Sequence, residues 1–374
     1  MKISILSVAP PYRGGIAEQT YCMSQYLSDI HDVNVINFKR QYPEFLFPGK
    51  TQYESETISR LDNNYRLVDT LNPFSWSVTA NFIIDRSPDL ILLRFWNPFF
   101  AISYSSIIKK IKKTLPRTKI IAVCDNIIPH EQSIFDKQLI KLLFSKIDGF
   151  IVMSDQVKDE LIDIKPKAQY KKLFHPVILE QKKYSQAKVR EELKIYNDKI
   201  ILFFGFVRSY KGLDTLIEAN QNLSQKLENY KIIICGECYG NDNKYNDMIA
   251  QFSKNNEIEW INEYLSEKTA SKYFAAADIV VLPYKSASQS GVIPLSYSYE
   301  KPVIASNIKG IKEMVQDKKT GFLFEKSDSK DLSSKIIKFY QSDINYKNNI
   351  IDFRKKFSWK NFTKEILDFY RTLS

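Results

Sequence analysis

Short apolar runs alternate with amphipathic stretches along the whole chain. Residues 3–8, 120–124 and 200–204 are apolar almost throughout, which is typical of strands buried on both faces of a parallel sheet. Residues 16–30 instead repeat apolar side chains at helical spacing. Because the two patterns alternate repeatedly, the chain is predicted to be an α/β protein whose parallel sheets are covered by helices.

The alternation of strands and helices is interrupted once. Residues 180–198 are charged and poor in large apolar side chains, so the domain boundary is placed there. This predicts a Rossmann-like N-terminal domain over residues 1–180, a Rossmann-like C-terminal domain over residues 181–355 and a terminal helix over residues 356–374. Residues 39–75 show no clear period and are predicted to be irregular.

The net charge of +11 favours a polyanionic partner. Nucleic acid is disfavoured, because the cations are dispersed along the chain and no recognition module is present. The partners that remain possible on charge alone are an anionic membrane surface and a phosphorylated substrate. The segment 101–117 joins an aromatic start to a cluster of lysines, which suits either anionic lipid or an ordinary surface helix.

Two further patterns limit the location and the cofactors. No signal-peptide pattern opens the sequence and no apolar run reaches about 18 residues, so we expect a cytoplasmic protein that is soluble or peripheral on the inner face of the membrane. The pair Cys235 and Cys238 has metal-ligand spacing, but a zinc site needs two more ligands and no second such pair exists. No metal site is predicted.

One turn has the chemistry of a phosphate site. A buried strand at residues 279–282 is followed by the Ser-rich turn 286–291 and then by an apolar helical segment at residues 292–299. Such a turn leaves backbone N–H groups pointing one way, with the helix dipole behind them, and a phosphate or diphosphate binds well there.

Two other loops also follow predicted strands. Arg208 and Lys211 lie where a strand passes into a helix, and two cations at such a place can neutralise a leaving diphosphate. The alternative interpretation is that both side chains are ordinary loop charges in contact with water. Gly14 and Gly15 close the loop after the first strand and let the backbone approach a ligand closely.

The motifs together resemble glycosyltransferase family 4. The resemblance is carried, in order, by FFGFVRSYKGLDTLIEA, ADIVVLPY, KPVIASNIKGIKEMV and TGFLFE, with APPYRGGIAEQT at the start and SWKNFTKEILDFYR at the end. It implies the GT-B fold: two Rossmann-like domains facing a central cleft, with a C-terminal helix that crosses back to the first domain. It also implies retaining, metal-independent transfer from a UDP- or GDP-linked sugar, with no further cofactor.

The resemblance also assigns roles to residues of this chain. Arg208 and Lys211 would hold the donor diphosphate, and Asp125 with His130 would lie near the transferred sugar. The residues implied for donor binding are Gly14, Gly15, Gly205, Glu263, Tyr264, Leu265, Ser288, Gln289, Ser290, Gly291 and Val292.

The chain departs from the family pattern around the serine turn. The two acidic residues that flank this turn in the family are missing: Ala287 or Ser288 stands near the first position, and Leu295 or Ser296 near the second. We expect Ser288 or Gln289 to hydrogen-bond the sugar hydroxyls instead. Another departure is Phe206, which occupies the place of the family's arginine after the glycine.

The predicted function is that of a retaining hexosyltransferase. It would move a sugar from a nucleotide-sugar donor to a hydroxyl of a glycan or lipid-linked saccharide in cell-surface polysaccharide biosynthesis. The alternative is a non-catalytic GT-B protein that serves as a binding or scaffold partner in a polysaccharide assembly complex. A sugar-nucleotide epimerase is a weaker alternative, because no paired carboxylates are evident.

Overall fold

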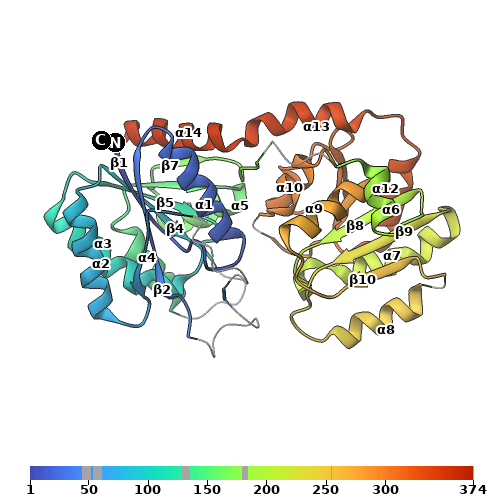
Figure 1. Ribbon diagram of the computed structural model, residues 1–374, viewed down its shortest axis with the longest axis horizontal. Helices are drawn as coiled ribbons and strands as arrows, with labels where there is room; N and C mark the ends of the chain where they lie inside the picture. The colour runs from blue at the N-terminus through green and yellow to red at the C-terminus, as the bar shows by residue number, and fades with distance from the viewer. Residues whose placement is uncertain are drawn as a thin grey trace. The chain divides into compact units, whose positions relative to one another are not determined.

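The chain folds into two compact units in the computed structural model (Figure 1). The structure describes residues 1–43, 52–53, 61–128, 135–178, 184–253, 255–287 and 289–373. Unit 1 consists of Met1–Phe174 together with Trp359–Ser374, and unit 2 of His175–Ser358. Unit 1 therefore ends upstream of the charged stretch at which the sequence placed the boundary, and its last helix comes from the end of the chain.

Unit 1 is built on a seven-stranded sheet in which every described pairing is parallel. The strand order is β3-β2-β1-β4-β5-β6-β7. Every residue of the central strand β4 is buried, which is the expected outcome for an apolar strand covered on both faces. The strands are β1 (Lys2–Leu6), β2 (Asp32–Arg40), β3 (Asn64–Asp69), β4 (Leu90–Phe95), β5 (Lys119–Cys124), β6 (Gly149–Val152) and β7 (Tyr170–Lys172).

The helices of unit 1 connect these strands. Helix α2 packs on α3, and α3 packs on α4, in chain order. Their apolar residues join those of the strands in one large core. The helices are α1 (Gly15–Ser28), α2 (Pro73–Arg86), the 3-10 turn η2 (Pro98–Phe100), α3 (Ala101–Thr114), α4 (Asp136–Phe144), α5 (Asp155–Ile164) and the C-terminal α14 (Trp359–Thr372).

The prediction that residues 39–75 are irregular was wrong in part. This stretch contains strand β3 and the start of helix α2, although residues 44–51 and 54–60 lie outside the described part. Strand β3 is an edge strand with only Val68 fully buried, so its apolar pattern is weak. Helix α2 begins after Asn72, whose side chain accepts a hydrogen bond from the Phe74 N–H.

Helix α14 packs against α1 within unit 1 (Figure 1). The Trp359 ring stacks on Tyr26 with centroids 6.3 Å apart, and it is almost fully buried. At the other end of α14, Phe369 and Leu373 pack so closely on Gly149 that a Cβ there would lie 2.8 Å from Phe369. The last helix thus completes the core of the first unit.

Unit 2 repeats the architecture with six parallel strands in the order β10-β9-β8-β11-β12-β13, which is the strand order of a doubly wound Rossmann sheet. Its strands are β8 (Lys199–Phe204), β9 (Tyr230–Cys235), β10 (Ile258–Ile261), β11 (Ile279–Leu282), β12 (Val303–Ser306) and β13 (Gly321–Phe324). Its helices are α6 (Gln186–Glu192), η3 (Ser209–Lys211), α7 (Leu213–Lys226), α8 (Asp242–Phe252), α9 (Glu267–Ala276), α10 (Val292–Ser298), α11 (Lys309–Lys312), α12 (Ser329–Tyr340), α13 (Tyr346–Arg354) and η4 (Lys355–Phe357).

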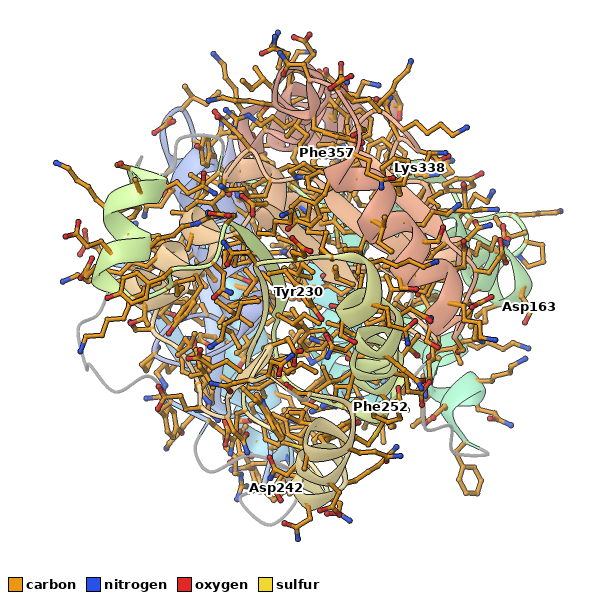
Figure 2. The ribbon with its side chains drawn as sticks, turned by 90° about the vertical axis from the view of Figure 1, so that its right-hand side faces the viewer. Asp163, Tyr230, Asp242, Phe252, Lys338 and Phe357 are labelled. Carbon is orange, nitrogen blue, oxygen red and sulfur yellow. The ribbon has the colours of Figure 1, made fainter. Side chains whose placement is uncertain are left out.

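A buried polar link fixes the helices of unit 2 at the edge shown in Figure 2. The Tyr230 hydroxyl donates to the side-chain oxygen of Asn220 at 2.7 Å, and the Asn220 amide donates to the Phe252 carbonyl at 2.8 Å. Because each buried polar group has a partner, the start of β9, helix α7 and the end of α8 are held together at little desolvation cost.

Candidate functional site

The first part of the site is the turn that follows strand β8. Gly205 has φ +107 and Gly212 has φ +67, both in the left-handed region that favours glycine. A Cβ on Gly212 would lie 1.9 Å from the Pro283 carbonyl oxygen. Only glycine therefore fits at this position beside the strand end. Between the two glycines, the 3-10 turn η3 ends at Lys211.

The Lys211 side chain lies where this turn approaches the start of helix α10, just after the serine turn. Its Nζ lies 2.8 Å from the position that a Cβ on Gly205 would take, and Val292 Cγ2 lies 3.9 Å from the same position. The ammonium also lies 5.5 Å from the centre of the Tyr284 ring. Burial lowers the pKa of Lys211, and the nearby Arg208 guanidinium lowers it further. A desolvated cation at a strand end is a candidate anion-binding group.

Arg208 has different surroundings from Lys211. It is exposed, and its guanidinium carbon lies 5.2 Å from the centre of the Tyr239 ring. Tyr239 contacts Phe206 with ring centroids 4.8 Å apart. The two cations predicted to hold a diphosphate therefore differ: Lys211 is half-buried at the strand end, and Arg208 is exposed on an aromatic surface.

The serine turn is partly engaged by its own side chains. Ser290 is buried, and its Oγ accepts a hydrogen bond of 3.2 Å from the Val292 N–H, one of the three groups expected to cap a diphosphate. At Gly291, a Cβ would lie 3.6 Å from the His175 imidazole, so this ring covers the turn. Ser288 lies outside the described residues. Gln289 follows it in the same turn and is half-buried.

The structure describes the surroundings of two of the positions at which the resemblance implies acidic residues. Ala287 is buried. Ser296 is fully buried inside α10, where its hydroxyl donates to the Val292 carbonyl at 2.7 Å. Ser296 therefore serves the helix itself. The sequence gives no sign of this role for His175, because its closeness to Gly291 depends on a contact between residues far apart in the chain.

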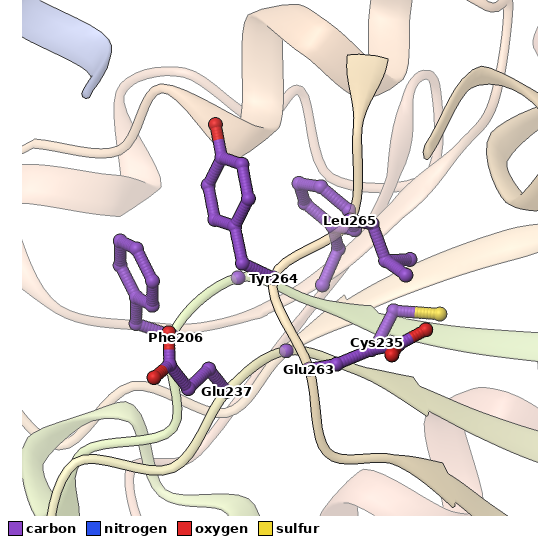
Figure 3. A pocket seen from close by; sticks show the side chains of 9 residues that line it. Phe206, Cys235, Glu237, Glu263, Tyr264 and Leu265 are labelled. Carbon is purple, nitrogen blue, oxygen red and sulfur yellow. The ribbon is translucent and has the colours of Figure 1, made fainter. Parts of the chain in front are cut away.

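A pocket lies beside Gly205, at the carboxyl ends of β8, β9 and β10 (Figure 3). The rings of Phe206 and Tyr264 stack with centroids 6.0 Å apart, and the figure shows them side by side over the pocket. Glu263, Tyr264 and Leu265, three of the residues that the resemblance implies for donor binding, line this pocket. The lining residues are Phe204, Gly205, Phe206, Cys235, Gly236, Glu237, Glu263, Tyr264 and Leu265.

Unit 1 has its own group of predicted residues at the carboxyl edge of its sheet. Gly14 precedes helix α1 with φ +122, and a Cβ on Gly14 or Gly15 would meet no atom within 4 Å. The loop therefore leaves open space at its tip. Asp125 follows strand β5, whereas His130 lies outside the described residues.

Asp125 belongs to a buried ion pair that sequence reasoning missed. Its carboxylate accepts two hydrogen bonds from Arg94, one of them 3.0 Å from Nε, and both side chains are almost fully buried. Arg94 Nη2 also donates to Gln19 Oε1 at 2.7 Å. The pair joins the ends of β4 and β5 to helix α1. Arg94 went unnoticed because it is the single charge in an otherwise apolar strand.

Two features are absent from the described residues. No group of three or more His, Cys, Asp or Glu side chains there is placed to hold a metal ion. Among the described helices, none combines the length and the apolar character needed to cross a membrane.

Comparison with known proteins agrees with this geometry. Residues 185–357 match the family model described as Glycosyl transferases group 1, which spans most of unit 2. An uncharacterized glycosyltransferase of Methanocaldococcus jannaschii is 24% identical over 382 residues, which cover 100% of this chain and 99% of the relative. The chain therefore contains a glycosyl transferases group 1 domain and is a homologue of glycosyltransferases.

Solved structures share the fold. Anabaena HepE in complex with UDP superposes with a TM-score of 0.77 at 16% identity, covering 100% of both chains. Sucrose-phosphate synthase from Thermosynechococcus elongatus gives a TM-score of 0.76 at 15% identity and covers 100% of this chain and 98% of that one. The prediction of an α/β protein with two Rossmann-like sheets of the GT-B type is confirmed.

Proposed function

We propose that the protein is a retaining, metal-independent glycosyltransferase. It moves a hexosyl group from a UDP- or GDP-linked sugar to a hydroxyl of a glycan or lipid-linked saccharide during cell-surface polysaccharide biosynthesis. In the reaction the bond between the anomeric carbon and the diphosphate oxygen breaks, and its electron pair leaves with the diphosphate. The acceptor oxygen bonds to that carbon, and the proton of the acceptor hydroxyl passes to the departing diphosphate. The negative charge that develops on the diphosphate is what the site must stabilise.

The observation that carries the proposal is the position of Lys211. Its ammonium is desolvated beside Gly205 and Val292, inside the domain that matches the glycosyl transferases group 1 model. A half-buried cation interacts more strongly with an anion than a fully solvated one does, because less water screens it. With Arg208 nearby, two positive charges are available to the leaving diphosphate, and this supports catalysis without a metal.

The pocket beside Gly205 supports the assignment of unit 2 to the donor. It adjoins the Lys211 ammonium through the shared Gly205, so a base in the pocket and a diphosphate at Lys211 are compatible with one nucleotide. The exposed Tyr264 and the Phe206 ring offer apolar faces on which a base can stack. The structurally similar HepE was solved in complex with UDP, which is consistent with this donor class.

Unit 1 is assigned to the acceptor. Its sheet edge has an open glycine loop at Gly14 and Gly15, and Asp125 lies at the same edge, held by Arg94. Because Arg94 holds the Asp125 carboxylate in place, we propose that Asp125 positions its loop and contributes negative charge there. A role as a mobile general base is disfavoured by this pairing.

The test is nucleotide binding and turnover by purified protein. Calorimetry with UDP and with GDP identifies the base, and release of the nucleoside diphosphate from the corresponding sugar nucleotide reports hydrolysis in the absence of an acceptor. The double variant Arg208→Ala, Lys211→Ala should lose turnover by at least a hundredfold while its circular dichroism spectrum stays unchanged. Lys338→Ala, an exposed helical cation of unit 2, is the control.

Three outcomes would overturn the assignment. Full turnover by the double variant would show that the diphosphate binds elsewhere. Absence of binding to any nucleotide or nucleotide sugar would favour the scaffold alternative. Product formation from the sugar nucleotide without transfer or hydrolysis would instead indicate an epimerase.

A further inference from the structure

Exposed hydrocarbon side chains gather on one part of unit 1. Of the thirteen large hydrophobic residues that are exposed in the described chain, five are tyrosines, whose hydroxyls suit a wet surface. Six of the remaining eight belong to helices α2, α3 and α4 or to the residues just before them. These six are Leu71, Phe74, Val78, Ile102, Phe135 and Leu142.

The apolar residues of α2 share their surface with a cation. Phe74 is 84% exposed and Val78 is 57% exposed, one helical turn apart on the same side of α2. Ser77 lies between them, and the Lys110 ammonium of the neighbouring helix donates to its hydroxyl at 3.2 Å. A positive charge is therefore held directly beside two protruding apolar side chains.

Helix α3 continues the same mixture. Ile102, Ser106, Lys109, Lys110 and Lys113 follow one another at helical spacing along its outer side, and the helix contains no acidic residue. The next helix adds exposed Leu142.

Lys146 extends the positive charge just beyond α4. Burial lowers the pKa of this residue, and the neighbouring Lys109 lowers it further, so the two cations are close enough to repel each other. We name the outer side of helices α2, α3 and α4 the α2–α4 face.

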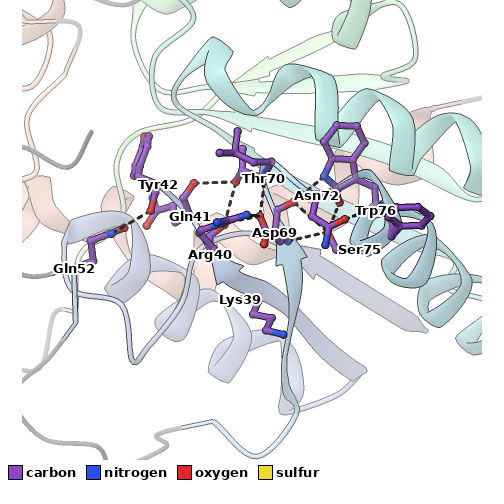
Figure 4. Close-up of polar contacts among 12 residues, drawn as sticks. Lys39, Arg40, Gln41, Tyr42, Gln52, Asp69, Thr70, Asn72, Ser75 and Trp76 are labelled. Carbon is purple, nitrogen blue, oxygen red and sulfur yellow. Dashed lines mark hydrogen bonds and ion pairs between the residues drawn. The ribbon is translucent and has the colours of Figure 1, made fainter. Parts of the chain in front are cut away.

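The turn that presents Leu71 and Phe74 is held by many hydrogen bonds (Figure 4). The Thr70 hydroxyl donates to the Gln41 carbonyl at 2.9 Å, and the Trp76 indole donates to the Asp69 carbonyl at 2.8 Å. Asp69 itself is paired with Arg40. Because this network fixes the backbone, the protruding apolar side chains belong to a built surface.

The face borders the edge of the sheet that carries the predicted acceptor residues. Leu71 follows the end of β3, and Ile102 follows the end of β4 after one 3-10 turn. Since the strands are parallel, these ends lie on the same edge as the loop after β1 and as Asp125 after β5.

We propose that the α2–α4 face docks on an anionic lipid membrane. Its apolar side chains would enter the boundary of the hydrocarbon layer, and its lysines would contact anionic headgroups. The surface then holds the acceptor edge of unit 1 at the membrane, where a lipid-linked saccharide is presented. The docking itself rests on the surface of unit 1 and does not require the proposed transfer reaction.

Two other occupants fit the face less well. In a symmetric dimer formed through this face, Lys109, Lys110 and Lys113 of one copy would approach the same lysines of the other, which is unfavourable. Nucleic acid would satisfy the lysines but would leave Phe74 and Val78 without an apolar partner. An anionic bilayer satisfies both kinds of side chain.

Co-sedimentation of the full chain with vesicles tests the proposal without donor or acceptor. The protein should bind vesicles of phosphatidylcholine mixed with phosphatidylglycerol, should bind phosphatidylcholine vesicles weakly, and should be released by salt. Each lysine near an anionic leaflet contributes roughly fivefold to binding. The triple change Lys109→Gln, Lys110→Gln, Lys113→Gln should therefore weaken binding about a hundredfold, and Phe74→Asp at least about tenfold.

The matched control removes the same charge from another place. Lys188, Lys226 and Lys338 are exposed on helices of unit 2, and their change to Gln should weaken binding much less. Equal losses for the two triple variants would overturn the proposal, as would equal binding to both kinds of vesicle or no binding at all. A wild-type dimer that Phe74→Asp dissociates, with vesicle binding unchanged, would identify the face as a subunit interface. Retained nucleotide binding by the variants separates this test from that of the proposed function.

Discussion

At the scale of single residues, Lys211 combines a cost to stability with the role proposed for it in binding the diphosphate. Burial lowers its pKa, so at a pH between the folded and unfolded pKa values the unfolded chain binds more protons. The charge therefore disfavours folding at neutral pH, and stability should rise as the pH increases toward the unfolded value. A residue that weakens the fold in this way is typical of a functional site.

We predict that Lys211→Met raises the free energy of unfolding at neutral pH, because it removes a desolvated charge while keeping the volume of the side chain. It should also remove the rise of stability with pH and weaken binding of the nucleoside diphosphate at least about tenfold. Denaturant unfolding at several pH values and calorimetry measure the two effects. A less stable variant that binds the nucleotide normally would contradict the assignment.

A second prediction concerns Gly212. With φ +67 and a Cβ position only 1.9 Å from the Pro283 carbonyl oxygen, this residue meets backbone that cannot move cheaply. Gly212→Ala should lower the free energy of unfolding by about 2–4 kcal/mol. Gly15→Ala, where no atom lies within 4 Å of the new Cβ, should change it by less than about 0.5 kcal/mol. Comparable losses for both variants in chemical denaturation would refute this interpretation.

At the scale of elements, the Arg94–Asp125 pair joins the ends of two strands to a helix. Arg94→Met leaves a buried carboxylate without its partner, which should cost about 3–5 kcal/mol of stability. The double variant Arg94→Met, Asp125→Leu removes both charges and should recover most of the loss. Chemical denaturation of the wild type, both single variants and the double variant gives the coupling energy.

The same cycle separates structure from catalysis at Asp125. A stable double variant that has lost sugar transfer would place Asp125 in the chemistry, whereas a stable and active one would limit it to positioning. Purely additive losses of stability would show that the two charges are not coupled and would refute the ion pair as the link between β4, β5 and α1.

The sequence predicted most of the strands and helices that have a clear apolar pattern. Strands such as β4 and β8 are apolar because both faces are covered, so their period is clear. Strand β3 lies at an edge and α2 follows it directly, so neither had a pattern strong enough to identify it. Loops at the carboxyl ends of strands were predicted to form the site because they contain glycines and cations.

Contacts between distant residues were beyond the sequence. The closeness of Lys211 to Gly205 and Val292, the imidazole of His175 over Gly291 and the pairing of Arg94 with Asp125 each depend on tertiary packing. Composition indicates that cations are present but not which of them is buried. The sequence therefore predicted which loops follow buried strands, whereas the surroundings of each side chain required the structure.

At the scale of the whole molecule, the chain of unit 1 is interrupted by all of unit 2 and is completed by α14. The core of unit 1 should then depend on residues that follow unit 2 in the chain. Trp359, nearly fully buried against Tyr26, is one such residue, and truncating it leaves a cavity worth about 3–5 kcal/mol. Because Trp359 belongs to unit 1, we predict that Trp359→Ala loosens unit 1 alone.

Hydrogen exchange followed by mass spectrometry measures this selectivity. Peptides from β1, β4 and β5 should exchange faster in Trp359→Ala, while those from β8, β9 and β11 keep their wild-type protection. Phe274→Ala, a fully buried residue of unit 2 that packs on Phe204, should give the reverse pattern. If both variants loosened both sheets equally, the two units would unfold as one cooperative body, and helix α14 would stabilise the whole chain instead of the first unit. Selective loosening by each variant would instead show that the two sheets are separate folding units, with the last helix of the chain belonging to the first.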